Sequence, residues 1–207
     1  MHNLYSSLTQ YGVHTHLKSK DEFNSFPYVK WTEETFTYVK YNPRRSVNRW
    51  GLSLTSLDGG MSGVPDLDSL HQYNKENNTN LEEKNFDKPT PAFLESKRVQ
   101  DFLDPYKDYM FRTHILRLDP GGYFPKHRDF KGNNFSSVRL ICPLKNPCTF
   151  ILEDKILEWQ ESELYFLDTA KVHYLFNATF MPSYWLVVNL HLNEETYSII
   201  TDNFRYT

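Results

Sequence analysis

The C-terminal half of the chain alternates short apolar runs with polar breaks. Six runs rich in β-branched and aromatic residues lie at 110–118, 138–142, 149–152, 164–167, 173–177 and 184–192. Pro, Gly, Asn or charged residues separate them, which is typical of short strands. Several strands at this spacing predict a mainly β fold, a sandwich or barrel. Among the closed or double-sheet arrangements, a cupin-like jelly roll puts metal ligands on inward faces near one mouth.

The N-terminal half has a less regular pattern. Residues 28–31, 36–41 and 51–57 look like short strands, and 92–103 resembles an amphipathic helix bounded by prolines. Residues 58–91 are poor in apolar side chains, with 74–83 close to structureless. This polar loop is either a tolerated surface loop or a lid that is mobile without substrate. We therefore predict one domain, 1–207, with an N-terminal α+β extension (1–109) and a β core (110–207).

Composition narrows the possible partners and location. The chain has 207 residues, 16% aromatic, enough to bury a real core, and its net charge of −3 predicts no general attraction to nucleic acid or anionic membranes. Arg44, Arg45 and Arg49 form a small basic cluster that we interpret as a solvated turn or a contact with a carboxylate. Cys142 and Cys148 are expected to be buried thiols. Without a signal-like start or a membrane-length apolar run, we expect a soluble, cytoplasmic protein.

The candidate chemistry follows the turn Asp119–Gly122. The segment after this turn carries His127 and Asp129, and residues two apart in a strand share one face. That spacing alone is weak, because it often occurs by chance. It gains weight from the apolar run 164–167, which leads through a turn to His173. Two imidazoles and one carboxylate form the facial triad that leaves positions open on Fe(II) for a co-substrate.

A set of motifs in the C-terminal half, over about 111–192, resembles the aspartyl/asparaginyl β-hydroxylase family, a branch of the Fe(II)/2-oxoglutarate-dependent dioxygenases that includes proline hydroxylase-like members. The residues that carry the resemblance are Leu116–Gly122, Pro125, His127, Asp129, Glu163–Thr169, His173, Asn177 and Leu186–Val188.

The resemblance implies a double-stranded β-helix in which His127, Asp129 and His173 hold Fe(II). It also implies 2-oxoglutarate and O₂ as co-substrates, and hydroxylation of a C–H bond in an amino acid or in an Asp-, Asn- or Pro-like protein side chain. Asp168 and Thr169 would then orient His173, although a simple Asx turn explains them equally well.

The chain departs from the family pattern at the expected co-substrate cation. The family usually carries an Arg ten residues after the distal His, and this chain has Ser183 there. Arg139 is our first candidate for a cation that binds 2-oxoglutarate, and Arg117 is the second. His114 and His191 could also donate to a carboxylate, or they could be hydrogen-bonded barrel histidines.

Two other functions remain open on the sequence. A cupin-type metalloenzyme that does not use 2-oxoglutarate would keep the three ligands and need no buried Arg. A non-catalytic jelly-roll binding protein would make the pair His127 and Asp129 incidental. A further same-face pair, His14 and His16, has no carboxylate nearby in the sequence, and we interpret both as surface residues.

Overall fold

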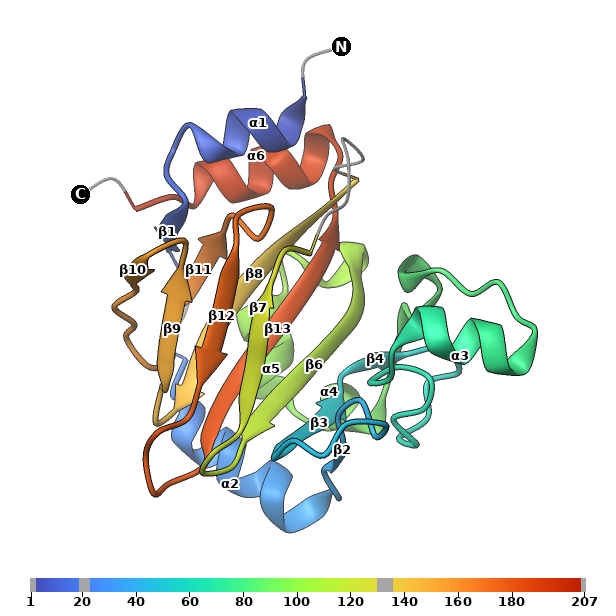
Figure 1. Cartoon of the computed structure of the whole chain (residues 1–207). Helices are drawn as coiled ribbons and strands as arrows, with labels where there is room; N and C mark the ends of the chain where they lie inside the picture. The colour runs from blue at the N-terminus through green and yellow to red at the C-terminus, as the bar shows by residue number, and fades with distance from the viewer. Residues whose placement is uncertain (1–2, 19–22, 130–135, 206–207) are drawn as a thin grey trace.

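A computed structural model describes residues 3–18, 23–129 and 136–205, and its core is a pair of facing antiparallel sheets (Figure 1). The core strands are β6 (Met110–Leu118), β7 (Tyr123–His127), β8 (Ser137–Lys145), β9 (Thr149–Leu152), β10 (Lys155–Ile156), β11 (Leu164–Leu167), β12 (His173–Phe176) and β13 (Ser183–His191). The large sheet contains the order β11-β8-β13-β6, and the small sheet runs β10-β9-β12-β7. Numbered one to eight, these orders are 6-3-8-1 and 5-4-7-2, which confirms the predicted jelly roll.

Strands of the N-terminal extension widen the large sheet at both edges. The strand β1 (His14–Leu17) pairs with β11, whereas β3 (Arg49–Ser53) pairs with β6 and β2 (Val39–Lys40) pairs with β3. A separate ribbon joins β4 (Thr55–Ser56) to β5 (Lys88–Pro89). The extension is therefore hydrogen-bonded directly to the jelly roll, and β3 lies beside its first strand.

Helices cover the ends and the outer face of the large sheet, with α1 and α6 side by side at one end (Figure 1). The helices are α1 (Leu4–Thr9), α2 (Ser25–Thr35), α3 (Leu70–Asn77), α4 (Pro91–Leu94), α5 (Lys97–Leu103) and α6 (Glu194–Asp202), with the 3₁₀ turns η1 (Glu83–Asn85) and η2 (Lys107–Tyr109). The predicted helix 92–103 exists as two short helices, α4 and α5, and α6 was not predicted.

The strand predicted at 28–31 is wrong, because these residues belong to α2. The side chain of Asn24 accepts a hydrogen bond from the backbone of Phe26 and so caps the helix. Pro27 lies in the first turn, where its missing N–H breaks no helical hydrogen bond. A cap and a tolerated proline therefore outweighed the strand-like composition of Tyr28–Trp31.

The polar segment 58–91 is also more structured than predicted, since it contains α3, η1 and β5. Arg112 of β6 holds it to the jelly roll, donating to the carbonyls of Asp66 at 2.9 Å and Asp68 at 2.6 Å and pairing with Glu83. Arg44 forms ion pairs with Asp68 and Glu76, as expected for part of the basic cluster. Two arginines thus tie this segment to its surroundings.

The buried apolar side chains form two clusters on opposite faces of the large sheet. One packs the helices against the sheet, and the other fills the space between the two sheets. The second cluster comprises Leu116, Leu118, Ile141, Cys148, Phe150, Leu152, Leu167, Leu175, Trp185 and Val187. Cys142 and Cys148 are buried and free, as expected. No helix in the described ranges combines the length and apolar character needed to cross a bilayer.

Candidate metal centre

The three predicted ligands meet where β7 and β12 run side by side. His127 ends β7 and is the register partner of His173, which begins β12. Asp129 lies just beyond β7, and its backbone N–H donates to the carbonyl of Thr169 at 3.1 Å. One possible ligand atom from each of His127, Asp129 and His173 lies within 4.8 Å of the other two. The turn before β12 therefore holds the carboxylate beside both imidazoles.

Backbone carbonyls fix the tautomers of both candidate imidazole ligands. The Nδ1 atom of His127 donates to the carbonyl of Pro125 at 2.7 Å, and that of His173 donates to the carbonyl of Lys171 at 3.0 Å. Because a carbonyl only accepts, Nδ1 carries the proton and Nε2 keeps its lone pair. Burial lowers the pKa of His173, which favours the neutral ring that a metal requires.

Arg139 keeps the candidate carboxylate ligand ionised. Burial alone would raise the pKa of Asp129, but the paired guanidinium of Arg139 and the two imidazoles hold that pKa well below its usual range. The Nε atom of Arg139 donates to Asn189 Oδ1 at 2.9 Å, and Asn189 Nδ2 donates to the carbonyl of Arg112 at 2.8 Å. A continuous chain of polar contacts therefore runs from Asp129 to the segment that Arg112 anchors.

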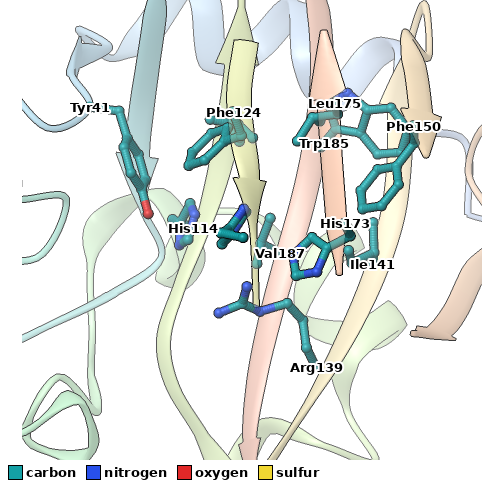
Figure 2. Close-up of a pocket in the computed structure, with 12 residues that line it drawn as sticks. Tyr41, His114, Phe124, Arg139, Ile141, Phe150, His173, Leu175, Trp185 and Val187 are labelled. Carbon is teal, nitrogen blue, oxygen red and sulfur yellow. The ribbon is translucent and has the colours of Figure 1, made fainter. Parts of the chain in front are cut away.

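The candidate ligands stand where two cavities meet, and Arg139 lines both. The inner cavity lies between the sheets and holds about 60 Å³ of free space. The outer cavity is wider, at about 400 Å³, and includes Asp129 in its wall. The inner cavity is lined by Tyr41, His114, Leu116, Phe124, His127, Arg139, Ile141, Phe150, His173, Leu175, Trp185 and Val187 (Figure 2). The outer cavity is lined by Glu82–Lys84, Phe111, Asp129, Ser136–Arg139, Asn189 and His191.

A family model described as aspartyl/asparaginyl beta-hydroxylase matches residues 70–191 of this chain, more than half of its length. The chain belongs to the aspartyl/asparaginyl β-hydroxylase family. The match contains β6 to β13 and all three candidate ligands, so it confirms the resemblance seen in the sequence. No curated protein sequence matches the chain significantly.

Solved structures match this family member over less than half of its length, with low identities and low TM-scores. A predicted oxalate decarboxylase from Thermotoga maritima is 16% identical, covering 41% of this chain and 70% of its own, with a TM-score of 0.34. The Cupin_2 domain of an XRE family transcriptional regulator from Enterobacter cloacae is 8% identical, covering 41% of this chain and 84% of its own, with a TM-score of 0.34.

Two of the four further candidate residues in this family member reach the cavities. His114 lines the inner cavity, and its Nδ1 donates to the carbonyl of Arg112 at 3.0 Å. Burial lowers the pKa of His114 to about 3, so its ring is neutral. His191 lines the outer cavity and packs on Phe111, with 4.6 Å between ring centroids.

Arg117 and Ser183, the other two candidates, do not reach either cavity. Arg117 lies on the opposite face of β6, where its Nε donates to Asp119 at 2.6 Å. The Ser183 hydroxyl accepts hydrogen bonds from the Trp185 indole at 2.7 Å and the backbone N–H of Cys148 at 3.1 Å. Both lone pairs of the Ser183 hydroxyl oxygen therefore accept from protein donors.

Of the two explanations offered for Asp168 and Thr169, the Asx turn holds for Asp168. Asp168 accepts hydrogen bonds from the Tyr5 hydroxyl and the backbone N–H of Ala170, whereas the Nδ1 atom of His173 bonds to the carbonyl of Lys171. One interpretation of the sequence is wrong. His14 and His16 are not surface residues, because their half-buried rings stack on Tyr165 at centroid distances of 4.7 Å. His16 also pairs with Glu163, a carboxylate distant in the sequence.

Sequence reasoning also missed most of the cavity wall. The aromatic residues Tyr41, Phe124, Phe150 and Trp185 surround the same space as the candidate ligands in this family member (Figure 2). The alternation of Trp185 and Val187 along β13 is the available sequence signal, since residues two apart face the same way. Tyr41 gave no such signal, because it reaches the cavity from the irregular start of the chain.

Proposed function

We propose that this protein is an Fe(II)- and 2-oxoglutarate-dependent dioxygenase that hydroxylates a C–H bond of an amino acid or a protein side chain. The observation that carries the proposal is the convergence of two imidazole Nε2 atoms and one carboxylate where two cavities meet. This donor set suits Fe(II), and three protein ligands leave coordination positions for other groups. Membership of the hydroxylase family supports the same reaction class.

The ligand residues fit a metal before one binds. His127 and His173 have their Nδ1 protons held by carbonyls, and Asp129 is kept ionised by Arg139. The His127 side chain keeps 33% of its surface exposed, so the centre is open on one side. When bound, Fe(II) with 2-oxoglutarate and O₂ would supply the oxidation, in which one oxygen atom becomes the product hydroxyl, the other enters succinate, and CO₂ is released.

The remaining residues have separate roles in this proposal. Arg139, which lines both cavities beside Asp129, would contact a carboxylate of 2-oxoglutarate close to the metal. The aromatic wall, including Phe150 and Trp185, would exclude water from the inner cavity. His114, neutral and with Nδ1 already bonded, would offer Nε2 as an acceptor.

We place the amino-acid or side-chain substrate in the outer cavity. Its wall combines the acidic pair Glu82 and Glu83, the base Lys84 and the hydroxyls of Ser136 and Ser137. A wall with both charges and neutral hydrogen-bonding groups suits a zwitterionic or peptide-like ligand better than a polyanion. The described residues of this wall form no continuous basic surface of the kind that nucleic acid requires.

Anaerobic reconstitution tests the function. Protein freed of metal is titrated with Fe(II) and then with 2-oxoglutarate, and the visible absorption of the resulting complex is recorded. We expect one metal ion per chain and an absorption band that grows with 2-oxoglutarate, and neither feature in the His173→Ala variant. Metal binding without the band would reject the 2-oxoglutarate assignment, and absence of metal binding would reject the enzyme itself.

One observation favours a second candidate, a cupin-type metalloenzyme that does not use 2-oxoglutarate. Ser183 replaces the family's usual Arg and is fully hydrogen-bonded within the protein. Among the described residues that line the inner cavity, Arg139 is the one with a guanidinium or ammonium group, and it is already paired with Asp129. Formation of succinate from 2-oxoglutarate by the Fe(II)-loaded protein in air would exclude this candidate.

A further inference from the structure

Arg49 is a buried cation, and no carboxylate among the described residues pairs with it. Its side chain leaves the strand β3 and only 3% of the residue's surface is exposed. The one hydrogen bond that its side chain makes among the described residues joins Nη1 to the carbonyl of Tyr123 at 3.4 Å, near the limit for such a bond. Its Nε is buried without a partner. The basic cluster was expected to be solvated or paired with a carboxylate, and Arg49 is neither.

A buried guanidinium is costly unless a carboxylate or several acceptors surround it. Arg112, on the neighbouring strand β6, has three acceptors, the carbonyls of Asp66 and Asp68 and the carboxylate of Glu83. Arg49 instead lies over the ring of Phe124, with Cζ 4.1 Å from its centroid. A cation–π contact compensates only part of the lost hydration. An anion bound at Arg49 would therefore supply the charge compensation that the described residues do not provide.

The register of the large sheet places Arg49 in a specific row. Arg49 is the Cα partner of Leu118 on one side, and Ser183 is the Cα partner of Leu118 on the other. Directly paired residues point to the same face of a sheet. Gly51, on the same face as Arg49, pairs with Leu116, which lines the inner cavity. Arg49 thus faces the space between the sheets, in the row of Ser183 and two strands from it.

Two rings connect Arg49 to the candidate metal centre. Tyr41 and Phe124 both line the inner cavity, and both lie beside Arg49, whose Cζ is 5.6 Å and 4.1 Å from their centroids. Phe124 also stacks on His127, with 6.1 Å between ring centroids. The guanidinium therefore stands directly behind the aromatic wall, one ring away from a candidate ligand.

We propose that Arg49 is the carboxylate-binding residue for the distal end of 2-oxoglutarate. The diacid would extend from the centre formed by His127, Asp129 and His173 toward the row of Ser183, and would reach Arg49 when the ring of Phe124 or Tyr41 turns aside. This inference rests on the proposed function. It assigns the missing cation to a strand of the N-terminal extension, whereas Arg139 stays with Asp129 and the carboxylate nearest the metal.

The first variant is Arg49→Met, which keeps the apolar stem and removes the charge. Removal of an uncompensated buried charge should leave the melting temperature of the metal-free protein unchanged or raise it. Arg45→Met is the matched control, because Arg45 is exposed and four residues away. If Arg49 had only a structural role, Arg49→Met would instead melt at least about 4 °C lower than the control.

The binding test compares two 2-oxo acids by calorimetry on Mn(II)-loaded protein. 2-Oxoglutarate and 2-oxopentanoate have the same five-carbon chain, and only the first has a distal carboxylate. We expect the wild type and Arg45→Met to bind 2-oxoglutarate about 10- to 100-fold more tightly than 2-oxopentanoate, the range of a hydrogen bond to a charged group. Arg49→Met should lose this preference and bind 2-oxopentanoate as the wild type does. Arg49→Lys should recover part of it.

Each other outcome gives a distinct answer. If Arg49→Met keeps the preference for 2-oxoglutarate, the assignment of Arg49 is wrong and the proposed function stands. If the wild type binds both acids equally, no residue recognises a distal carboxylate, so Arg49 is again excluded while chelation at the metal remains. If the wild type binds neither acid, both the assignment of Arg49 and the use of 2-oxoglutarate are rejected.

Discussion

The metal end of the inner cavity, where the three candidate ligands lie, differs from the surroundings of Arg49 in how far polar groups are satisfied. At the metal end, His127 and His173 each bond to a carbonyl, and Asp129 is paired with Arg139. Behind the aromatic wall, Arg49 has an Nε without a partner among the described residues. The first arrangement is already organised for a ligand that accepts lone pairs, a metal cation. The second lacks a partner within the described chain and suits a ligand that brings negative charge.

The metal end is disrupted most completely by His173→Ala. Loss of one of the three candidate ligands should weaken Mn(II) or Fe(II) binding more than about 100-fold, because loss of an outer partner alone weakens binding about 10- to 100-fold. Calorimetric titration measures this, with His71→Ala on the exposed face of α3 as the control. An affinity equal to that of the wild type in His173→Ala would contradict the ligand assignment.

Arg139→Ala should distinguish the role of Arg139, near the metal, from that of Arg49, at the distal carboxylate. We expect binding of 2-oxoglutarate and of 2-oxopentanoate to weaken alike, by about 30-fold at saturating Mn(II), because a charge-assisted contact near the metal is lost for both acids. Arg139→Lys should recover only part, since a point charge replaces a planar fork. Arg117→Ala, on the other face of β6, is the matched control. A loss confined to Arg117→Ala would move the role to that residue.

His114 makes the cavity wall sensitive to acid. Its pKa is about 3 in the folded protein because of burial, against about 6.5 when unfolded. Between these values the unfolded chain binds a proton that the folded protein does not, so stability falls as the pH decreases from about 6.5 toward 3. Urea unfolding measures the free energy of unfolding at pH 7 and at pH 5. We expect its decrease between these two pH values to be about 1 to 2 kcal/mol smaller in His114→Gln than in the wild type. Equal losses in both proteins would contradict a neutral His114.

Asn189→Ala should have the smallest effect on metal affinity among these variants. Asn189 connects Arg139 to the carbonyl of Arg112, and its removal leaves both without that partner. Because Asn189 acts on Asp129 only through Arg139, we expect Mn(II) affinity to fall about 3-fold, less than for a direct partner of a ligand. Asn77→Ala on the exposed α3 is the control. A fall as large as that of His173→Ala would mean that Asn189 has a more direct role.

Much of the jelly roll was predictable because its strands are locally consistent. Residues 110–118, 164–167 and 184–192 match β6, β11 and β13 within a residue at most, since β-branched and aromatic residues there also pack in the core. The helix α2 was not predicted, because capping by Asn24 outweighed a strand-like composition. The helix α6 was missed although its capping box, formed by Asn193 and Thr196, is a readable signal.

The candidate site also contains residues that the sequence could predict and one that it could not. The proximity of His127, Asp129 and His173 was predictable because ligand types and strand spacing are local properties, and the structure brings these residues together. Arg49 was assigned to a solvated or paired cluster, because sequence alone does not show that a charge is buried without a partner. Its position depends on the pairing of β3 with β6, which joins segments about 65 residues apart.

A crystal structure of the Mn(II)-loaded protein with 2-oxoglutarate tests the central claim most directly, because it shows the candidate metal centre and Arg49 at once. We predict one metal ion bound by His127, Asp129 and His173, with the 2-oxo acid end at the metal and the distal carboxylate against the guanidinium of Arg49. A metal bound elsewhere, or a distal carboxylate held by another cation while Arg49 stays unpaired, would contradict this account.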